Sequence, residues 1–207
     1  MLIYFVTGLA ASSLHVISGP DHLAAVTPLA IESQKRAWRV GFAWGLGHTL
    51  GVFIIGILFL LFKDYIPVEI ISSYGEQIVG ILLILIGVWI FYRIFSKQAS
   101  HKIETRKNDS WTALGIGVIH GVAGVSHLIG ILPSLALPTK ADSISYILGF
   151  GVGTIITMVV FSAIMGLMSQ SAAARNQKKL LLGIRLIGSA AAVTVGIFWI
   201  FHSGAAH

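Results

Sequence analysis

The sequence contains no cysteine and few charged residues. Without cysteine the chain can form no disulfide, thiolate metal site or thiol–disulfide electron relay. Charged residues make up 11% of the chain, against roughly a quarter in soluble domains. No G-x-x-x-x-G-K-[ST] motif is present, so any drive from ATP would have to come from a partner. Hydrophobic residues reach 56% and the mean hydropathy is +0.87, which predicts a membrane protein.

Six apolar runs are long enough for membrane-spanning helices, which need about 17 to 25 residues. They cover roughly residues 2–31, 40–62, 78–95, 112–137, 143–168 and 182–201. We therefore predict an all-α integral membrane protein with about six transmembrane helices. The first run would measure roughly 45 Å as one straight helix, beyond a hydrocarbon core of about 30 Å. We expect it to break at Gly19-Pro20, and we expect the fourth run, interrupted by Pro133, to be broken or bent as well.

The basic residues predict an orientation. Twelve of the 14 lysines and arginines lie in the loops after the first, third and fifth runs or at the ends of the runs beside those loops, and only Lys63 and Lys140 lie in the other two loops. By the positive-inside rule the three basic segments are cytoplasmic and both termini lie outside. The net charge of +6 is spread over three loops, which topology explains better than nucleic-acid binding. We expect a bacterial cytoplasmic membrane protein, and the sequence leaves open a homo-oligomer. Residues 1–13 lack the basic start of a secretory signal, so we expect the first helix to be retained.

The chain repeats a pattern at an offset of 105 residues. Two histidines with six residues between them, and a proline, recur: His15, His22 and Pro28 match His120, His127 and Pro133. Each half holds three spans, an odd number, so the halves would enter the membrane from opposite sides as two inverted three-helix repeats. We predict a single transmembrane domain over residues 1–207, with repeat one about 1–95, a cytoplasmic loop about 96–111 and repeat two about 112–203.

Polar side chains within the apolar runs are the candidate ligands of a metal ion. They are His15, Asp21, His22, His48, His120 and His127. An unpaired carboxylate in a bilayer costs several kcal/mol, so Asp21 needs a partner or an aqueous cavity. Imidazole and carboxylate without thiolate suit Ni²⁺, Co²⁺, Zn²⁺ or Cu²⁺ better than Cu⁺, Mg²⁺ or Ca²⁺. These residues also have other interpretations: Asp21 with His22 as a structural pair or proton relay, His48 as a hydrogen bond between helices, and the two histidines in the second half as gating or packing residues.

Distance limits how these residues can act together. A straight helix would hold His15 and His22 on one face about 10 Å apart along its axis. Two residues at that distance cannot hold one ion alone. Either the break at Gly19-Pro20 brings them together or ligands arrive from both repeats.

Several of these segments resemble known motifs. Residues 15–22 (HVISGPDH) resemble the H-x-x-x-G-x-D-H motif of hydrogenase and urease accessory membrane proteins of the HupE/UreJ type. Residues 45–49 (GLGHT), and residues 148–150 (LGF) with Thr154, are similar to motifs of the NicO group of nickel/cobalt permeases and its UreH-like members. The resemblance implies a permease for Ni²⁺ or Co²⁺ in which His15, Asp21, His22 and His48 contact the ion. The chain departs from the permease pattern in having Gly151 where the later motif has aspartate.

We therefore expect a transporter of a divalent transition-metal cation, with nickel or cobalt as its substrate, rather than an enzyme. No prosthetic group is expected. Two alternatives remain open from the sequence. The first is a carrier of a small organic or sulfur-containing anion, held by helix ends and histidines. The second is an intramembrane redox or enzyme subunit in which the histidines hold a fixed metal or haem.

Overall fold

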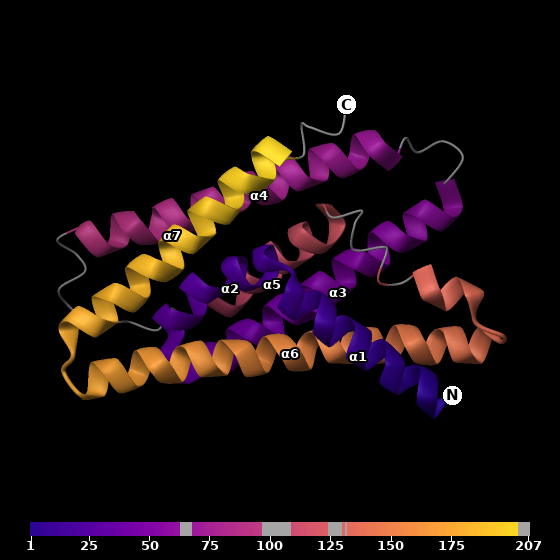
Figure 1. The fold of residues 1–207 in the computed structure, drawn as a ribbon, viewed down its shortest axis with the longest axis horizontal. Helices are drawn as coiled ribbons and strands as arrows, with labels where there is room; N and C mark the ends of the chain where they lie inside the picture. Colours follow the sequence, from indigo (N-terminus) through magenta and orange to yellow (C-terminus); the bar gives the residue numbers. More distant parts are fainter. Residues whose placement is uncertain (63–67, 97–108, 124–129, 131, 203–207) are drawn as a thin grey trace.

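The computed structural model describes residues 1–62, 68–96, 109–123, 130 and 132–202, and all regular structure within them is helical. This confirms the predicted all-α class. The helices are α1 (Leu2–Ser18), α2 (Pro20–Ser33), η1 (Gln34–Arg36), α3 (Ala37–Phe62), α4 (Val68–Phe95), α5 (Asp109–Ala123), η4 (Leu132–Ala136), α6 (Lys140–Ala174) and α7 (Lys178–His202). Figure 1 shows them as an elongated bundle of helices.

Four segments of the described chain are long and apolar enough to cross a membrane. They are Pro20–Leu58, Tyr74–Phe95, Lys140–Ala174 and Lys178–His202. α1 and α5 are shorter, at 17 and 15 residues. Large apolar side chains such as Leu85, Ile187 and Phe201 are 61–73% exposed. An apolar exterior of this kind suits contact with lipid, so the structure supports an integral membrane protein.

The first predicted run is broken where expected. α1 ends at Ser18 and α2 begins at Pro20, and Gly19 between them is extended, with φ −84° and ψ 101°. The Gly19 N–H still donates to the His15 carbonyl, at 3.0 Å. Pro20 takes the first position of the new helix, where its missing N–H leaves no intrahelical bond unmade. In the fourth predicted run, α5 ends at Ala123 and η4 contains Pro133, while residues 124–129 and 131 lie outside the described part.

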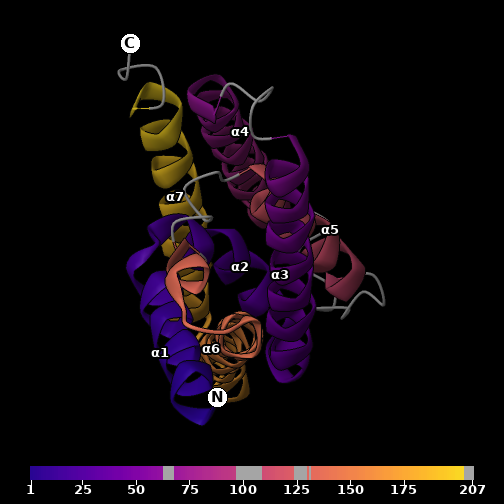
Figure 2. The same ribbon diagram turned by 90° about the vertical axis from the view of Figure 1, so that its right-hand side faces the viewer.

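α2 is the central helix of the bundle. It contacts each of the other six α-helices, and eleven of its fourteen residues are buried. Figures 1 and 2 show it enclosed by its neighbours. A helix whose whole circumference is covered must bury its polar residues too, so those of α2 need partners inside the bundle.

Glycines allow the surrounding helices to pack closely in pairs. α1 packs on α6, α3 on α5, and α4 on α7. A Cβ at Gly149 would lie 2.1 Å from the Phe5 carbonyl oxygen, and one at Gly117 would lie 2.3 Å from that of Trp44. In the third pair, Gly80 and Gly196 each face the other's carbonyl oxygen. Any side chain at these crossings would push the helices apart.

The carboxylate at the far end of α2 is buried between two arginines. Glu32, which the sequence places at the edge of the first run, is only 8% exposed. Arg185 at the start of α7 donates from Nε to Oε1 at 2.5 Å, and Arg93 near the end of α4 lies 3.4 Å from Oε2. The cluster therefore ties the α4–α7 pair to the central helix.

The segments that flank the basic loops meet at this same end of the bundle. Ser33 of α2 donates to Asp109 of α5 at 3.2 Å, beside the Glu32 cluster. At the opposite end, the amino group of Met1 lies 3.1 Å from the Asp142 carboxylate at the start of α6 (Figure 1). The arrangement fits a topology in which the predicted cytoplasmic segments share one side. The predicted central loop, at residues 97–108, lies outside the described residues.

Candidate metal centre

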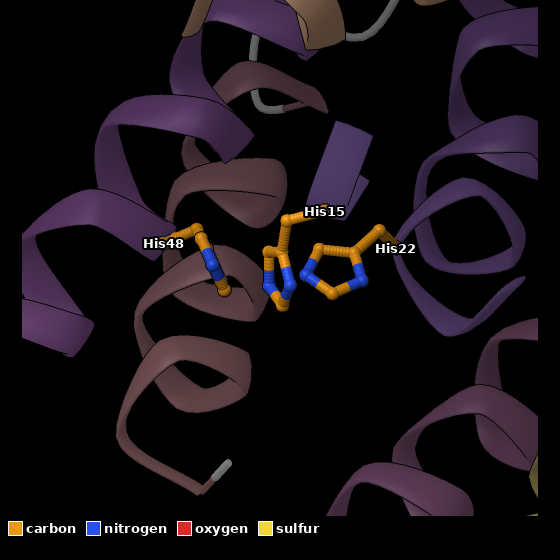
Figure 3. Close-up of side chains that lie close together, drawn as sticks. All are labelled: His15, His22 and His48. Atoms are coloured by element: carbon orange, nitrogen blue, oxygen red, sulfur yellow. The ribbon is translucent and has the colours of Figure 1, made fainter. Parts of the chain in front are cut away.

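Four helices bring a carboxylate and four imidazoles together beside the break at Gly19. His15 lies in the last turn of α1, Asp21 and His22 lie in the first turn of α2, and His48 and His120 lie on α3 and α5. The ring centroid of His22 lies 4.8 Å from that of His15, 5.0 Å from that of His48 and 4.9 Å from that of His120. Figure 3 shows three of these rings side by side, with His22 on the α2 ribbon and His48 opposite. His22 is thus the centre of the cluster.

Asp21 joins the two halves of the chain. Its Oδ1 lies 3.0 Å from Nδ1 of His22, and its Oδ2 lies 3.1 Å from Nε2 of His120. A carboxylate on one ring nitrogen fixes the orientation of an imidazole and makes the other nitrogen a better metal ligand. Asp21 lies in the first turn of α2, where the positive end of the helix dipole favours a negative charge. The buried carboxylate therefore has the partners that the bilayer requires.

Two overlapping groups of side chains have the composition of metal-ligand sets. One is His15, His22 and His48; the other is Asp21, His22 and His120; in each, one potential ligand atom per residue lies within 4.8 Å of the others. Three ligand atoms about 2.0–2.1 Å from one ion lie about 3.3–3.6 Å apart in tetrahedral or trigonal geometry. Each group would therefore need to contract by up to about 1.5 Å to hold an ion. His22 belongs to both groups.

The cluster is buried except at His15, which is partly exposed. His22, His48 and His120 are at most 1% exposed and Asp21 is 5% exposed. Charges interact more strongly in such a dry interior than in water. Gly19 contributes to the close fit, since a Cβ there would lie 2.4 Å from Nδ1 of His22. A larger residue at the break would displace the central imidazole.

Five of the six predicted site residues lie together, and the sixth, His127, falls outside the described residues. Both arrangements that the sequence left open are present. The break at Gly19-Pro20 brings the His15 and His22 rings close together, and the second half of the chain contributes His120. Thr154 lies 105 residues after Thr49, at the equivalent position of the second half. Its hydroxyl donates a hydrogen bond to the Phe150 carbonyl within α6.

The sequence prediction missed Trp44. Its indole is completely buried and lies parallel to His48, with centroids 5.0 Å apart and an angle of 7° between the planes. The signal available in the sequence was its position four residues before His48, which puts both side chains on one face of the helix.

Residues 3–197 match the protein family described as the cytochrome c biogenesis protein transmembrane region. Chloroplast protein FOR GROWTH AND FERTILITY 1 of Arabidopsis thaliana is 33% identical over 183 residues, 80% of this chain and 50% of that protein. The chain thus spans about half the length of this plant relative and of its counterpart, protein 2 of the same name. No solved structure matches the chain.

Two further relatives carry functional names. Urease accessory protein UreH of a Bacillus strain is 32% identical over 163 residues, covering 72% of this chain and 70% of that protein. A Methanocaldococcus jannaschii protein provisionally named a nickel/cobalt efflux system is 25% identical over 209 residues, covering 97% of this chain and 94% of that protein. These matches confirm the predicted resemblance to UreH-like proteins and nickel/cobalt permeases. Neither name describes an enzyme, in agreement with the sequence prediction.

Proposed function

Because the chain belongs to the family described as the cytochrome c biogenesis protein transmembrane region, and its relatives include a urease accessory protein and a provisional nickel/cobalt efflux system, we propose that it is a membrane transporter of a divalent transition-metal cation, nickel or cobalt. One observation carries this proposal: His22, at the centre of the bundle, is shared by two His/Asp groups drawn from four helices. The chain has no cysteine, so thiol redox chemistry is not available to it.

The ligand chemistry favours a cation over an anion. Neutral imidazoles with one carboxylate suit borderline divalent ions. Asp21 lies against both His22 and His120, so an organic or sulfur-containing anion entering the cluster would meet a negative charge in a dry environment. The urease accessory and efflux names of the relatives point in the same direction.

Transport by this site would use His22 as a shared ligand. The group of His15, His22 and His48 and the group of Asp21, His22 and His120 would then be two adjacent binding positions for the ion, joined by the His22 ring. Because imidazole must be unprotonated to bind metal, protons compete with the ion. Alternating access would then require one half of the bundle to rock against the other around α2.

The helix contacts support the inverted repeats. The α1–α6 pair corresponds to the α5–α3 pair when the halves are exchanged, and α4 pairs with α7. At the 105-residue offset, the contact of Gly153 with Ser12 corresponds to that of His48 with Gly117. We infer one domain with repeats at about 1–95 and 112–203, the basic end cytoplasmic, both termini outside, and the bacterial cytoplasmic membrane as its location.

The proposal is tested by Ni²⁺ flux in proteoliposomes, with Co²⁺ and Zn²⁺ as competitors and sulfate as an anion substrate. We expect saturable Ni²⁺ flux in the native protein and its loss in His22→Ala. His202→Ala is the matched control, because this exposed histidine at the end of α7 lies outside both ligand groups. Sulfate flux without Ni²⁺ flux, or normal Ni²⁺ flux in a correctly inserted His22→Ala variant, would contradict the proposal.

A further inference from the structure

An aromatic side chain that cannot ligate a metal contacts three of the clustered histidines. The ring centroid of Trp44 lies 5.0 Å from that of His48, 5.3 Å from that of His120 and 5.7 Å from that of His22. The three imidazoles lie 4.9–5.7 Å from one another. The four rings therefore pack at similar separations, and the indole excludes water from the side of the cluster that it covers.

Trp44 has little freedom to leave this position. It is the largest completely buried side chain among the described residues. Its backbone lies against α5, where a Cβ on Gly117 would approach its carbonyl oxygen to 2.3 Å. The next residue, Gly45, faces Ile155 of α6 at a similarly short distance. α3 is thus held between two helices at this turn, and the indole is held with it.

Two properties of indole bear on metal binding. It has no lone pair to offer, since its nitrogen is a hydrogen-bond donor only. Its face attracts positive charge, and the Trp44 ring lies parallel to that of His48. An imidazole that binds a divalent cation becomes partly positive, so the stacked indole stabilises the metal-bound form of His48. The same stacking fixes the plane in which the His48 nitrogens can point.

We propose that Trp44 determines the metal specificity of this site: it holds His48 for binding and fills the space in which water would complete a six-coordinate shell. This inference rests on the proposed function, and it adds the basis for discrimination. Mg²⁺ requires near-octahedral oxygen coordination and gives up its waters reluctantly, so a site closed by an indole rejects it. Ni²⁺, Co²⁺ and Zn²⁺ accept nitrogen ligands in smaller coordination numbers.

The test uses the visible absorption of Co²⁺ bound to the purified full-length protein in detergent. Four-coordinate Co²⁺ absorbs strongly, whereas six-coordinate Co²⁺ absorbs weakly. We expect intense bands in the native protein, and weak bands with about tenfold lower Co²⁺ affinity in Trp44→Leu, which loses the aromatic face and admits water.

Two further variants separate this role from a loss of packing. Trp199→Leu removes a tryptophan that packs against the core from α7, and it should keep the native spectrum. Trp44→Phe keeps an aromatic face in a smaller ring, so it should retain most of the Co²⁺ affinity while its bands weaken. It also serves as the test if Trp44→Leu does not fold.

Native band intensity and native Co²⁺ affinity in both folded Trp44 variants would overturn the specificity role. So would weak, six-coordinate bands in the native protein. Absence of Co²⁺ and Ni²⁺ binding by the native protein would instead overturn the proposed function, so the two failures are distinguishable.

Discussion

Neutralising Glu32 tests whether the end of α2 opposite the metal centre holds the bundle together. The carboxylate side chain is 7% exposed, against 15% for Arg185 and 31% for Arg93. Glu32→Gln keeps the size and one acceptor oxygen but removes the charge. Two arginines would then face each other across a neutral amide within a mostly buried cluster.

The expected loss of stability follows from the two contacts. Removing one partner of a buried ion pair costs about 3–5 kcal/mol, because the remaining charge stays buried and unpaired. The shorter contact, to Arg185, carries most of this effect. Arg93 is partly exposed and lies at 3.4 Å, so solvent screens its pair, which contributes about 0–1 kcal/mol. We expect a total near 3 kcal/mol, or about 6–12 °C in melting temperature for a chain of this length.

Thermal unfolding of the purified protein in one detergent measures this change. Asp142→Asn is the control, since that carboxylate pairs with an exposed amino terminus at the other end of the bundle, and we expect little change from it. The double variant Glu32→Leu/Arg185→Leu should recover much of the lost stability, because apolar residues of similar volume often replace a buried pair without loss. A melting temperature for Glu32→Gln within about 2 °C of native would refute the reasoning.

Three other predictions concern the metal centre. Gly117→Ala should destabilise the protein by about 1–3 kcal/mol and reduce metal affinity, because its Cβ would meet the Trp44 carbonyl, whereas Gly115→Ala, with nothing within 4 Å, should be neutral or slightly stabilising in the same melting assay. Asp21→Asn should weaken Ni²⁺ binding about 10- to 100-fold in calorimetry, since it loosens the orientation of His22 and His120; unchanged affinity would show that the carboxylate is structural only. Ni²⁺ affinity should fall as the pH is lowered, because protons compete for the imidazoles, and an affinity independent of pH would exclude histidine ligation.

Much of the fold could be predicted from the sequence because the bilayer imposes simple requirements on any chain that crosses it. Each helix must satisfy its own backbone and present apolar residues over a minimum length, so apolar runs alone located the helices. The break in the first run was predictable as well. Gly19-Pro20 lies inside a run too long for one span, and both residues disfavour an uninterrupted helix there.

Features that depend on which helices are neighbours could not be predicted from the sequence. Asp21 was known to need a partner, but its contact with His120 joins residues 99 positions apart in the sequence. Glu32 lies at the end of an apolar run, and only the packing of α4 and α7 around α2 reveals that it is buried. In the sequence, Trp44 cannot be distinguished from other aromatic residues of apolar helices. Only the structure shows that its ring packs against three imidazoles. Helix periodicity places a side chain on a face but does not identify what that face meets.

The repeated histidine pattern leads to an asymmetric centre. His15 and His120 occupy equivalent positions at the 105-residue offset, yet His15 groups with His22 and His48 whereas His120 bonds to Asp21. The cause lies one residue before the second histidine of each motif, which is Asp21 in the first half and Ser126 in the second. A single carboxylate can bind only the imidazoles within its reach, so it makes the equivalent histidines unequal. Under the proposed function, an ion meeting three imidazoles in one group and a carboxylate with two imidazoles in the other would find two different binding positions within a duplicated scaffold.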